Sequence, residues 1–364
     1  MREVEAIGAN VLASASREQM AYNIDTSKAS VAEALEVLAD AVLNPKFQSW
    51  EVAEQIKKME KDLGNLSDNP QTALIEAIHT AAYQGGLGRP LIAPKDVLPM
   101  LNADVLAEFY AANYSAPRMV LAAAGIEHDQ LLKLAEPLLG GAPSGFDIEA
   151  PASRYVGGDW RQFAPSPVTH AVLAFEYAGG WRDVKGSVAM TVLQYLLGGG
   201  GSFSAGGPGK GMHSRLYTRV LNQYSWVHNC TGLSSIYNDT GLVGIFASAD
   251  SSRTDEMLGV MCREMEGVAK EVPSVELDRA KSAAISSILM NLESKAVIAE
   301  DIGRQVLTYG HRKPVDEFVK EIRALTAKDL ASSVQRLLKS PPSVAILGDV
   351  ANAPRYDAIS KRFA

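Results

Sequence analysis

The sequence predicts an α+β protein made of two homologous α/β sandwich domains, each with a mostly antiparallel sheet and helices on one face. Three observations support this prediction: an internal repeat, the order of strands and helices within each copy, and a turn-rich segment between the copies. The length of 364 residues also favours two hydrophobic cores over one.

The internal repeat has an offset of 224 residues. Leu101–Leu106 reads LNADVL, and Leu325–Leu330 reads LTAKDL. Four further pairs share this offset: Pro117 with Pro341, Val120 with Val344, Pro90 with Pro314, and Gly86 with Gly310. Several anchors at one offset indicate a duplicated structural unit.

Each copy predicts the same order of elements, from strand periodicity to helical periodicity and back. In the first copy these are a strand over Ala21–Asp25, helices over Val31–Leu43, Trp50–Leu63 and Gln71–Tyr83, a fourth helix starting at Asn102, and a strand over Met119–Ala124. In the second they are Leu242–Ser248, then Thr254–Val268, Val275–Leu292, Ala296–Tyr309, a helix starting at Thr326, and Ser343–Leu347. Asn102 and Thr326 are favourable N-cap residues.

Domain boundaries follow from the turn-rich segment. We predict a first repeat domain over residues 1–139, a linker over 140–160 and a second repeat domain over 161–364, because Gly140–Gly145 and Ala150–Ser153 lack periodicity. The second domain opens with a strand over Thr169–Tyr177 and a helix around Ser187–Leu197. At the repeat offset their counterparts would precede residue 1, so we expect the first domain to be incomplete at its N-terminus.

Composition narrows the function classes. The net charge is -7, from 35 basic and 42 acidic residues, which argues against nucleic acid as a partner. No apolar stretch approaches the roughly 20 residues of a membrane span. Two cysteines, Cys230 and Cys262, allow no disulfide framework beyond one bridge and fit a reducing compartment.

The most distinctive segment is the glycine-rich stretch Gly198–Gly211, in which eight of fourteen residues are glycine. A phosphate loop is disfavoured, because Gly209-Lys210 is followed by Gly211 instead of Ser or Thr, and the stretch follows a helix. A flexible surface linker and a flap that touches an extended ligand both remain open. Composition favours the linker, whereas a position between two helices of one repeat unit favours the flap.

These residues resemble a known family. Leu197–Met212, followed by Ser214–Tyr217, is similar to the glycine-rich loop of the alpha subunits of mitochondrial processing peptidases, which belong to the pitrilysin- and insulysin-like metallopeptidases. Ala6–Ala9 with Ser14–Glu18, and Tyr83–Pro90, resemble other segments of that family. The resemblance covers essentially the whole chain.

The resemblance implies a non-catalytic subunit with two similar α/β domains. It implies that the chain recognises presequence peptides, pairs with a zinc-bearing beta-type subunit, and lies on the matrix side of the mitochondrial inner membrane, with other subunits of the cytochrome bc1 complex (complex III) as further partners. The substrate-binding residues expected are Gly198, Gly199, Gly200, Gly201, Ser202, Phe203, Ser204, Gly206, Gly207, Gly209, Gly211 and Met212. Lys210 fits least well, because a basic presequence would repel it.

A zinc site is not expected in this chain. A zinc hydrolase of this kind needs two His four residues apart on a helix with a Glu between them, and no two of the six histidines have that spacing. Asp62, with Glu60 beside it, is the nearest match to the family's distal ligand, and we interpret both as exposed helix charges. We therefore expect no catalytic residue, metal or other cofactor here. For His213 and Arg215, contact with the substrate chamber and, for Arg215, pairing within its own domain are both open.

Two other functions fit the same residues. Relatives in the resembled family serve as core proteins of the cytochrome bc1 complex, so a purely structural role is one alternative. An active zinc peptidase whose motif precedes residue 1 is the other, and a longer sequence containing that motif would favour it.

Overall fold

The computed structural model describes residues 2–66, 69–145, 151–199 and 213–364. These residues form two compact units, and each unit takes elements from both copies of the repeat. Unit 1 comprises Met1–Gly64, Leu91–Pro151 and Leu289–Arg312. Unit 2 comprises Asn65–Pro90, Ala152–Ile288 and Lys313–Ala364.

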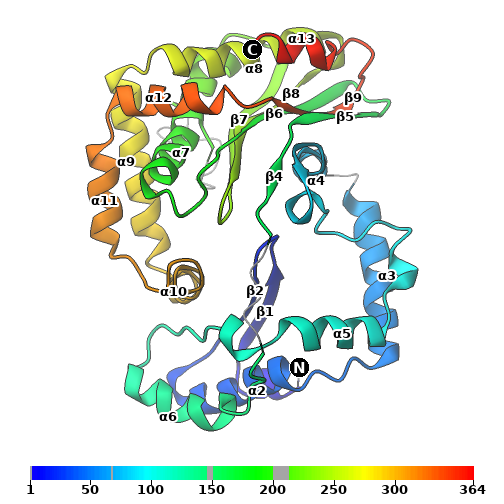
Figure 1. The fold of residues 1–364 in the computed structure, drawn as a ribbon, viewed down its shortest axis with the longest axis vertical. Helices are drawn as coiled ribbons and strands as arrows, with labels where there is room; N and C mark the ends of the chain where they lie inside the picture. The colour runs from blue at the N-terminus through cyan, green and yellow to red at the C-terminus, as the bar shows by residue number, and fades with distance from the viewer. Residues whose placement is uncertain (1, 67–68, 146–150, 200–212) are drawn as a thin grey trace. The chain divides into compact units, whose positions relative to one another are not determined.

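Unit 2 contains a five-stranded sheet with the strand order β5-β9-β6-β8-β7 (Figure 1). Its strands are β5 (Gly158–Phe163), β6 (Val168–Glu176), β7 (Val227–Ile236), β8 (Gly241–Asp250) and β9 (Ser343–Gly348). The β5–β9 pair is parallel and the other three pairs are antiparallel. The predicted mostly antiparallel sheet is therefore confirmed.

Three helices cover one face of this sheet: α7 (Val184–Leu197), α8 (Thr254–Lys270) and α12 (Ala327–Leu337). Alternate residues of β6, among them Leu173 and Phe175, point into this core and are fully buried. On α8, helical spacing places Met257, Met261 and Met265 in the same core. The helical face of the predicted sandwich is confirmed.

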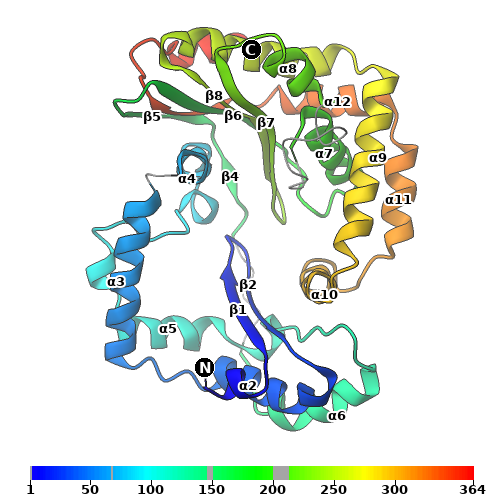
Figure 2. The same cartoon turned by 180° about the vertical axis from the view of Figure 1, so that it is seen from behind.

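Another helix, α4 (Pro70–Ala82), covers the opposite face of the sheet. Leu74 and Ile78 are fully buried and cluster with Val172 of β6 and Phe246 of β8. Figures 1 and 2 show α4 and α8 on opposite sides of the strands. The unit 2 sheet is thus covered on both faces, which extends the prediction of helices on one face.

The remaining elements of unit 2 complete this core and its margins. They are β3 (Tyr83–Gln84) paired with β4 (Arg154–Tyr155), α9 (Ser274–Asn291), α11 (Val315–Ala324) and α13 (Tyr356–Ser360). The N-cap predicted at Thr326 is present, since its hydroxyl accepts a hydrogen bond from the Asp329 amide at 3.1 Å. Neither α11 nor α6 of unit 1 is among the predicted helices.

Unit 1 is built around a two-stranded antiparallel hairpin. Its elements are α1 (Arg2–Ala6), β1 (Asn10–Ala15), β2 (Met20–Asp25), α2 (Val31–Leu43), α3 (Ser49–Leu66, whose last two residues lie beyond the unit), α5 (Ala103–Asn113), α6 (His128–Leu139) and α10 (Lys295–Tyr309). The helices α2 and α10 contact β2. The Tyr110 hydroxyl donates to the carbonyl of Val42 at 2.8 Å, which fixes α5 to the end of α2. The predicted N-cap Asn102 accepts from the Val105 amide at 3.0 Å.

The two compact units do not coincide with the two sequence repeats. Helices α4 and α10 are counterparts in the repeat, yet α4 belongs to unit 2 and α10 to unit 1. Each repeat therefore gives its third helix to the unit that holds the sheet of the other repeat. The boundaries at 139 and 160 describe the duplication, and as domain boundaries they remain a prediction.

The predicted strand over Met119–Ala124 is wrong, because this run has no regular secondary structure. Its counterpart β9 pairs with β5 on one side and β6 on the other. Within the described residues, no strand pairs with 119–124. An extended apolar run forms a strand only when a neighbour accepts its hydrogen bonds.

None of the helices in the described ranges combines the length and hydropathy required to cross a membrane.

Candidate functional site

The glycine-rich stretch begins where α7 ends. Gly198 adopts a left-handed conformation with φ of 100°, and its amide donates to the carbonyls of Gln194 and Tyr195. The Gly199 amide donates to the same Gln194 carbonyl at 2.8 Å. A left-handed cap with these bonds ends a helix and favours glycine. The other predicted binding residues, Gly200 to Met212, lie outside the described residues.

Both described glycines contact the edge strand β7. The Thr231 hydroxyl donates to the Gly198 carbonyl at 3.0 Å. A Cβ on Gly199 would lie 2.1 Å from the Gly232 carbonyl oxygen, so only glycine fits this approach. The start of the stretch therefore covers part of the open edge of the sheet, which a protein must protect from foreign strands.

The first residue of the stretch lies close to the chain that follows it. A Cβ on Gly198 would lie 2.5 Å from Oγ of Ser214. A linker between separate elements holds its ends apart, so the closeness of these two residues favours the interpretation of the stretch as a loop on one domain. We call Gly198, Gly199, Ser214, Thr231 and Gly232 the loop base.

Arg215 fixes the returning chain. Its side chain is 3% exposed; Nε donates to Glu264 of α8 at 3.0 Å, and Nη1 donates to Glu276 of α9 at 2.9 Å. A Cβ on Gly267 would lie 2.7 Å from Nη2, so this glycine leaves room for the guanidinium. Arg215 therefore pairs with carboxylates of its own unit, which decides between the two interpretations of this residue.

A second arginine completes the charge balance. Arg219, on the π-helical turn Tyr217–Leu221, donates to the other oxygen of Glu276 at 2.7 Å and is 41% exposed. Two arginines thus face two glutamates, and Leu216 between them is fully buried. A buried charge is tolerated only when it is paired and hydrogen-bonded in this way.

The chain matches two families over most of its length. The family described as "Insulinase (Peptidase family M16)" matches residues 1–95, and "Peptidase M16 inactive domain" matches residues 100–284. The chain belongs to peptidase family M16. Two family domains in tandem agree with the prediction of two domains.

Two relatives of this M16 chain carry the same name. It is 54% identical to the "Mitochondrial-processing peptidase subunit alpha" of Solanum tuberosum, covering 100% of this chain and 72% of the relative. It is 36% identical to the Homo sapiens protein of the same name, covering 94% of this chain and 69% of the relative. The resemblance found in the sequence is confirmed.

A solved structure shares the fold. A chain of "Complex III2 from Candida albicans, Inz-5 bound" superimposes with a TM-score of 0.81 at 17% identity, covering 98% of this chain and 86% of that chain. At this identity the match shows that the M16 architecture is common to both, and it carries no site residue across.

The histidines of the M16 chain have structural surroundings. His79 of α4 is fully buried; its Nδ1 donates to the Ile75 carbonyl at 2.6 Å, which leaves Nε2 to accept from the Tyr237 hydroxyl at 2.6 Å. Over the described part of the chain, no three His, Cys, Asp or Glu side chains are grouped to hold a metal ion. Glu60 and Asp62 are exposed on α3, as expected.

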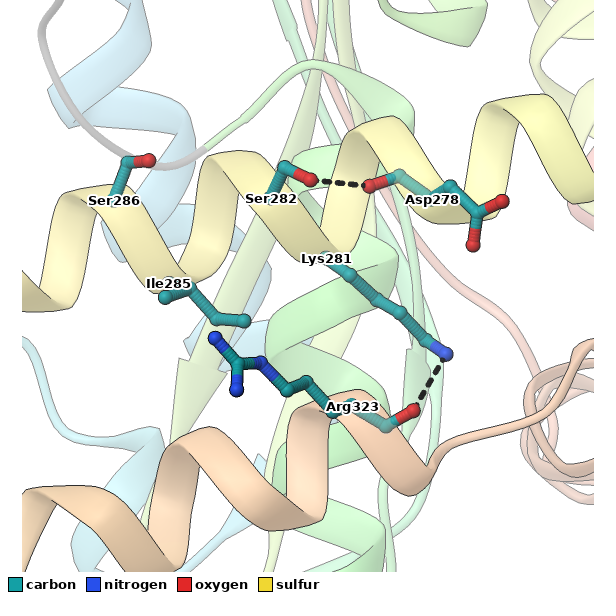
Figure 3. Close-up of a pocket in the computed structure, with 6 residues that line it drawn as sticks. All are labelled: Asp278, Lys281, Ser282, Ile285, Ser286 and Arg323. Atoms are coloured by element: carbon teal, nitrogen blue, oxygen red, sulfur yellow. Dashed lines mark hydrogen bonds between the residues drawn. The ribbon is translucent and has the colours of Figure 1, made fainter.

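A shallow depression lies elsewhere on unit 2, between α9 and α11 (Figure 3), with a volume of about 400 Å³. Lys281 donates to the Arg323 carbonyl at 3.0 Å, and Ser282 donates to the Asp278 carbonyl at 2.8 Å. Ile285 is its only large apolar lining residue. Small-molecule sites are mostly apolar and enclosed, so this depression does not have their character.

Both cysteine thiols are expected to be unreactive in the folded M16 chain. Burial, reinforced by the charge of Glu264, raises the pKa of Cys230 to about 12, and burial raises that of Cys262 to about 11. A thiol-reactive disulfide reagent at pH 8 should label them only after denaturation, because the thiolate is the reacting form. Rapid labelling of two thiols per native chain would contradict this.

The sign of the pH effect follows from the same shifts. The folded chain keeps both thiol protons above pH ~8.5, where the unfolded chain loses them. Their contribution to stability is therefore complete below about pH 8.5 and is lost as pH rises through the folded pKa values. Unfolding midpoints measured from pH 8 to 11 should fall less for a Cys230→Ala, Cys262→Ala variant.

Proposed function

We propose that this chain is the non-catalytic subunit of a mitochondrial processing peptidase and recognises presequences through the glycine-rich stretch Gly198–Gly211. A zinc-bearing beta-type subunit supplies the hydrolytic chemistry. The observation that carries this proposal is the loop base, in which Gly198 and Ser214, the described residues on either side of positions 200–212, lie close together on unit 2. The names of the relatives support the same function.

Glycine suits the recognition of many unrelated peptides. Eight of the fourteen residues carry no side chain, so contacts with a peptide come mainly from backbone amides and carbonyls. Backbone contacts recognise the main chain of an extended peptide more than its side chains, and this permits broad specificity. The net charge of -7 complements the basic character of presequences and would speed their encounter.

The same relatives favour a mitochondrial location, and we propose the matrix side of the inner membrane as the place of action. A presequence is encountered there after import. The fold match to a chain of complex III is consistent with this location.

Replacing residues 200–212 with a short Ser-Asn turn should weaken peptide binding without releasing the partner subunit. The turn spans Gly199 and His213, whose neighbours Gly198 and Ser214 are already in contact, so the rest of unit 2 should keep its fold. Affinity can be measured by fluorescence anisotropy with a labelled arginine-rich amphipathic peptide, and partner retention by size-exclusion chromatography. Unchanged affinity would contradict the proposed function. Hydrolysis by this chain without a partner would instead favour the active-peptidase alternative.

A structural role in complex III is a second candidate, favoured by the fold match at TM-score 0.81. It predicts that the chain co-purifies with membrane-bound cytochromes after mild detergent extraction. Recovery of the chain only as a free heterodimer would contradict this role. The two roles do not exclude each other.

A further inference from the structure

We propose that Arg215 is a positioning residue for peptide recognition, which fixes the loop base without touching the peptide. The inference rests on the proposed function and assigns part of the peptide affinity to a buried ion-pair cluster. It concerns the described ends of the glycine-rich stretch and the helices that hold them.

The guanidinium connects three parts of unit 2. Nε and Nη1 of Arg215 reach different helices, through Glu264 on α8 and Glu276 on α9. The planar guanidinium holds its donors on separate nitrogens in fixed directions, whereas a lysine ammonium carries its three donors on one nitrogen and cannot reproduce both bonds with this geometry. Arg215 therefore fixes the backbone that follows the stretch relative to both α8 and α9.

Burial strengthens the ion pairs of Arg215. Glu264 and Glu276 are 16% and 19% exposed, and Arg215 itself is 3% exposed. Partly buried charges are screened less by solvent and salt, so displacement of the guanidinium would leave Glu264 without this partner and Glu276 with Arg219 alone. Arg219 also donates to Glu276 but is 41% exposed. It therefore serves as a more exposed comparison for Arg215 within the same cluster.

The link from Arg215 to the loop base is direct. Arg215 follows Ser214, whose hydroxyl oxygen lies 2.5 Å from where a Cβ of Gly198 would be. A shift of the arginine backbone therefore moves Ser214 against Gly198 and its bond to Thr231. The Arg215 ion pairs thereby fix Ser214 and Gly198, the described residues on either side of positions 200–212, relative to each other.

The test compares Arg215→Lys with Arg219→Lys in the complex with the beta-type subunit. We expect Arg215→Lys to raise the Kd for a labelled arginine-rich amphipathic peptide about tenfold, and Arg219→Lys to change it less than about twofold. In cleavage assays KM should rise for Arg215→Lys while kcat stays near its original value, because the chemistry belongs to the partner. A merely structural role would lower the active fraction, and thus kcat, with KM unchanged.

The outcomes separate this inference from the proposed function. Absence of peptide binding by the unmodified complex contradicts the proposed function. Binding by the unmodified complex, with equal Kd values for the two lysine variants, overturns only the role of Arg215. If Arg215→Lys does not fold, Glu264→Gln replaces it: this variant keeps the bonds to Glu276 and should still raise the Kd several-fold, whereas an unchanged Kd overturns the inference.

Discussion

Truncation of Ile78 to alanine should lower the free energy of unfolding of unit 2 by about 2–5 kcal/mol. Ile78 is fully buried in α4 and packs in the cluster that contains Val172 and Phe246 of the sheet. Removing its side chain beyond Cβ opens a cavity that the rigid β-sheet cannot close. Urea denaturation followed by circular dichroism measures the loss, and hydrogen exchange locates it in β6 and β8.

The matched control is Gln71→Ala, on the exposed side of the same helix. This change should alter stability by less than about 0.5 kcal/mol, because the side chain has no buried contact to lose. Equal effects of the two substitutions, or loss of protection in unit 1 alone, would show that α4 does not cover the unit 2 sheet in solution.

A methyl group at position 199 should disrupt the loop base. In Gly199→Ala the new Cβ would lie 2.1 Å from the Gly232 carbonyl oxygen, which is backbone and cannot rotate away. Relief requires the chain to leave the edge of β7, at a cost of about 1–3 kcal/mol. We expect the affinity for an arginine-rich amphipathic peptide to fall about tenfold or more, as measured by fluorescence anisotropy.

Gly141→Ala provides the control for this prediction. A Cβ on Gly141 would meet no atom within 4 Å, and its φ is not left-handed, so stability should stay the same or rise slightly. Full peptide affinity in Gly199→Ala would mean that the approach of Gly199 to β7 is not needed for binding.

Local signals in the sequence located the helices well. Helix α2 has the predicted bounds Val31–Leu43, because its apolar periodicity is continuous and ends before Asn44-Pro45. The N-caps at Asn102 and Thr326 are equally local, since a cap bonds to an amide three residues ahead. The helices α6 and α11 were not predicted, and Pro137 interrupts the pattern of α6.

Contacts between residues far apart in the chain were harder to predict from the sequence. The Met119–Ala124 run has strand composition, but strand formation depends on a neighbour that sequence periodicity does not report. Arg215 finds its carboxylates 49 and 61 residues away, on two helices whose approach depends on the folded core. Of the predicted binding residues, the structure describes Gly198 and Gly199 and brings them against β7.

The sequence by itself determined the duplication, most of the helices in each copy, the position of the glycine-rich stretch and the membership of family M16. These properties depend on periodicity, caps and residue identity, which act over a few neighbours or recur at a fixed offset. Only the tertiary structure decided that α4 and α10 exchange between units, and that Gly198 lies against Ser214 next to the ion-paired Arg215. Both arrangements depend on which apolar surfaces remain to be buried once a sheet has formed. Those surfaces are known only when the core is assembled.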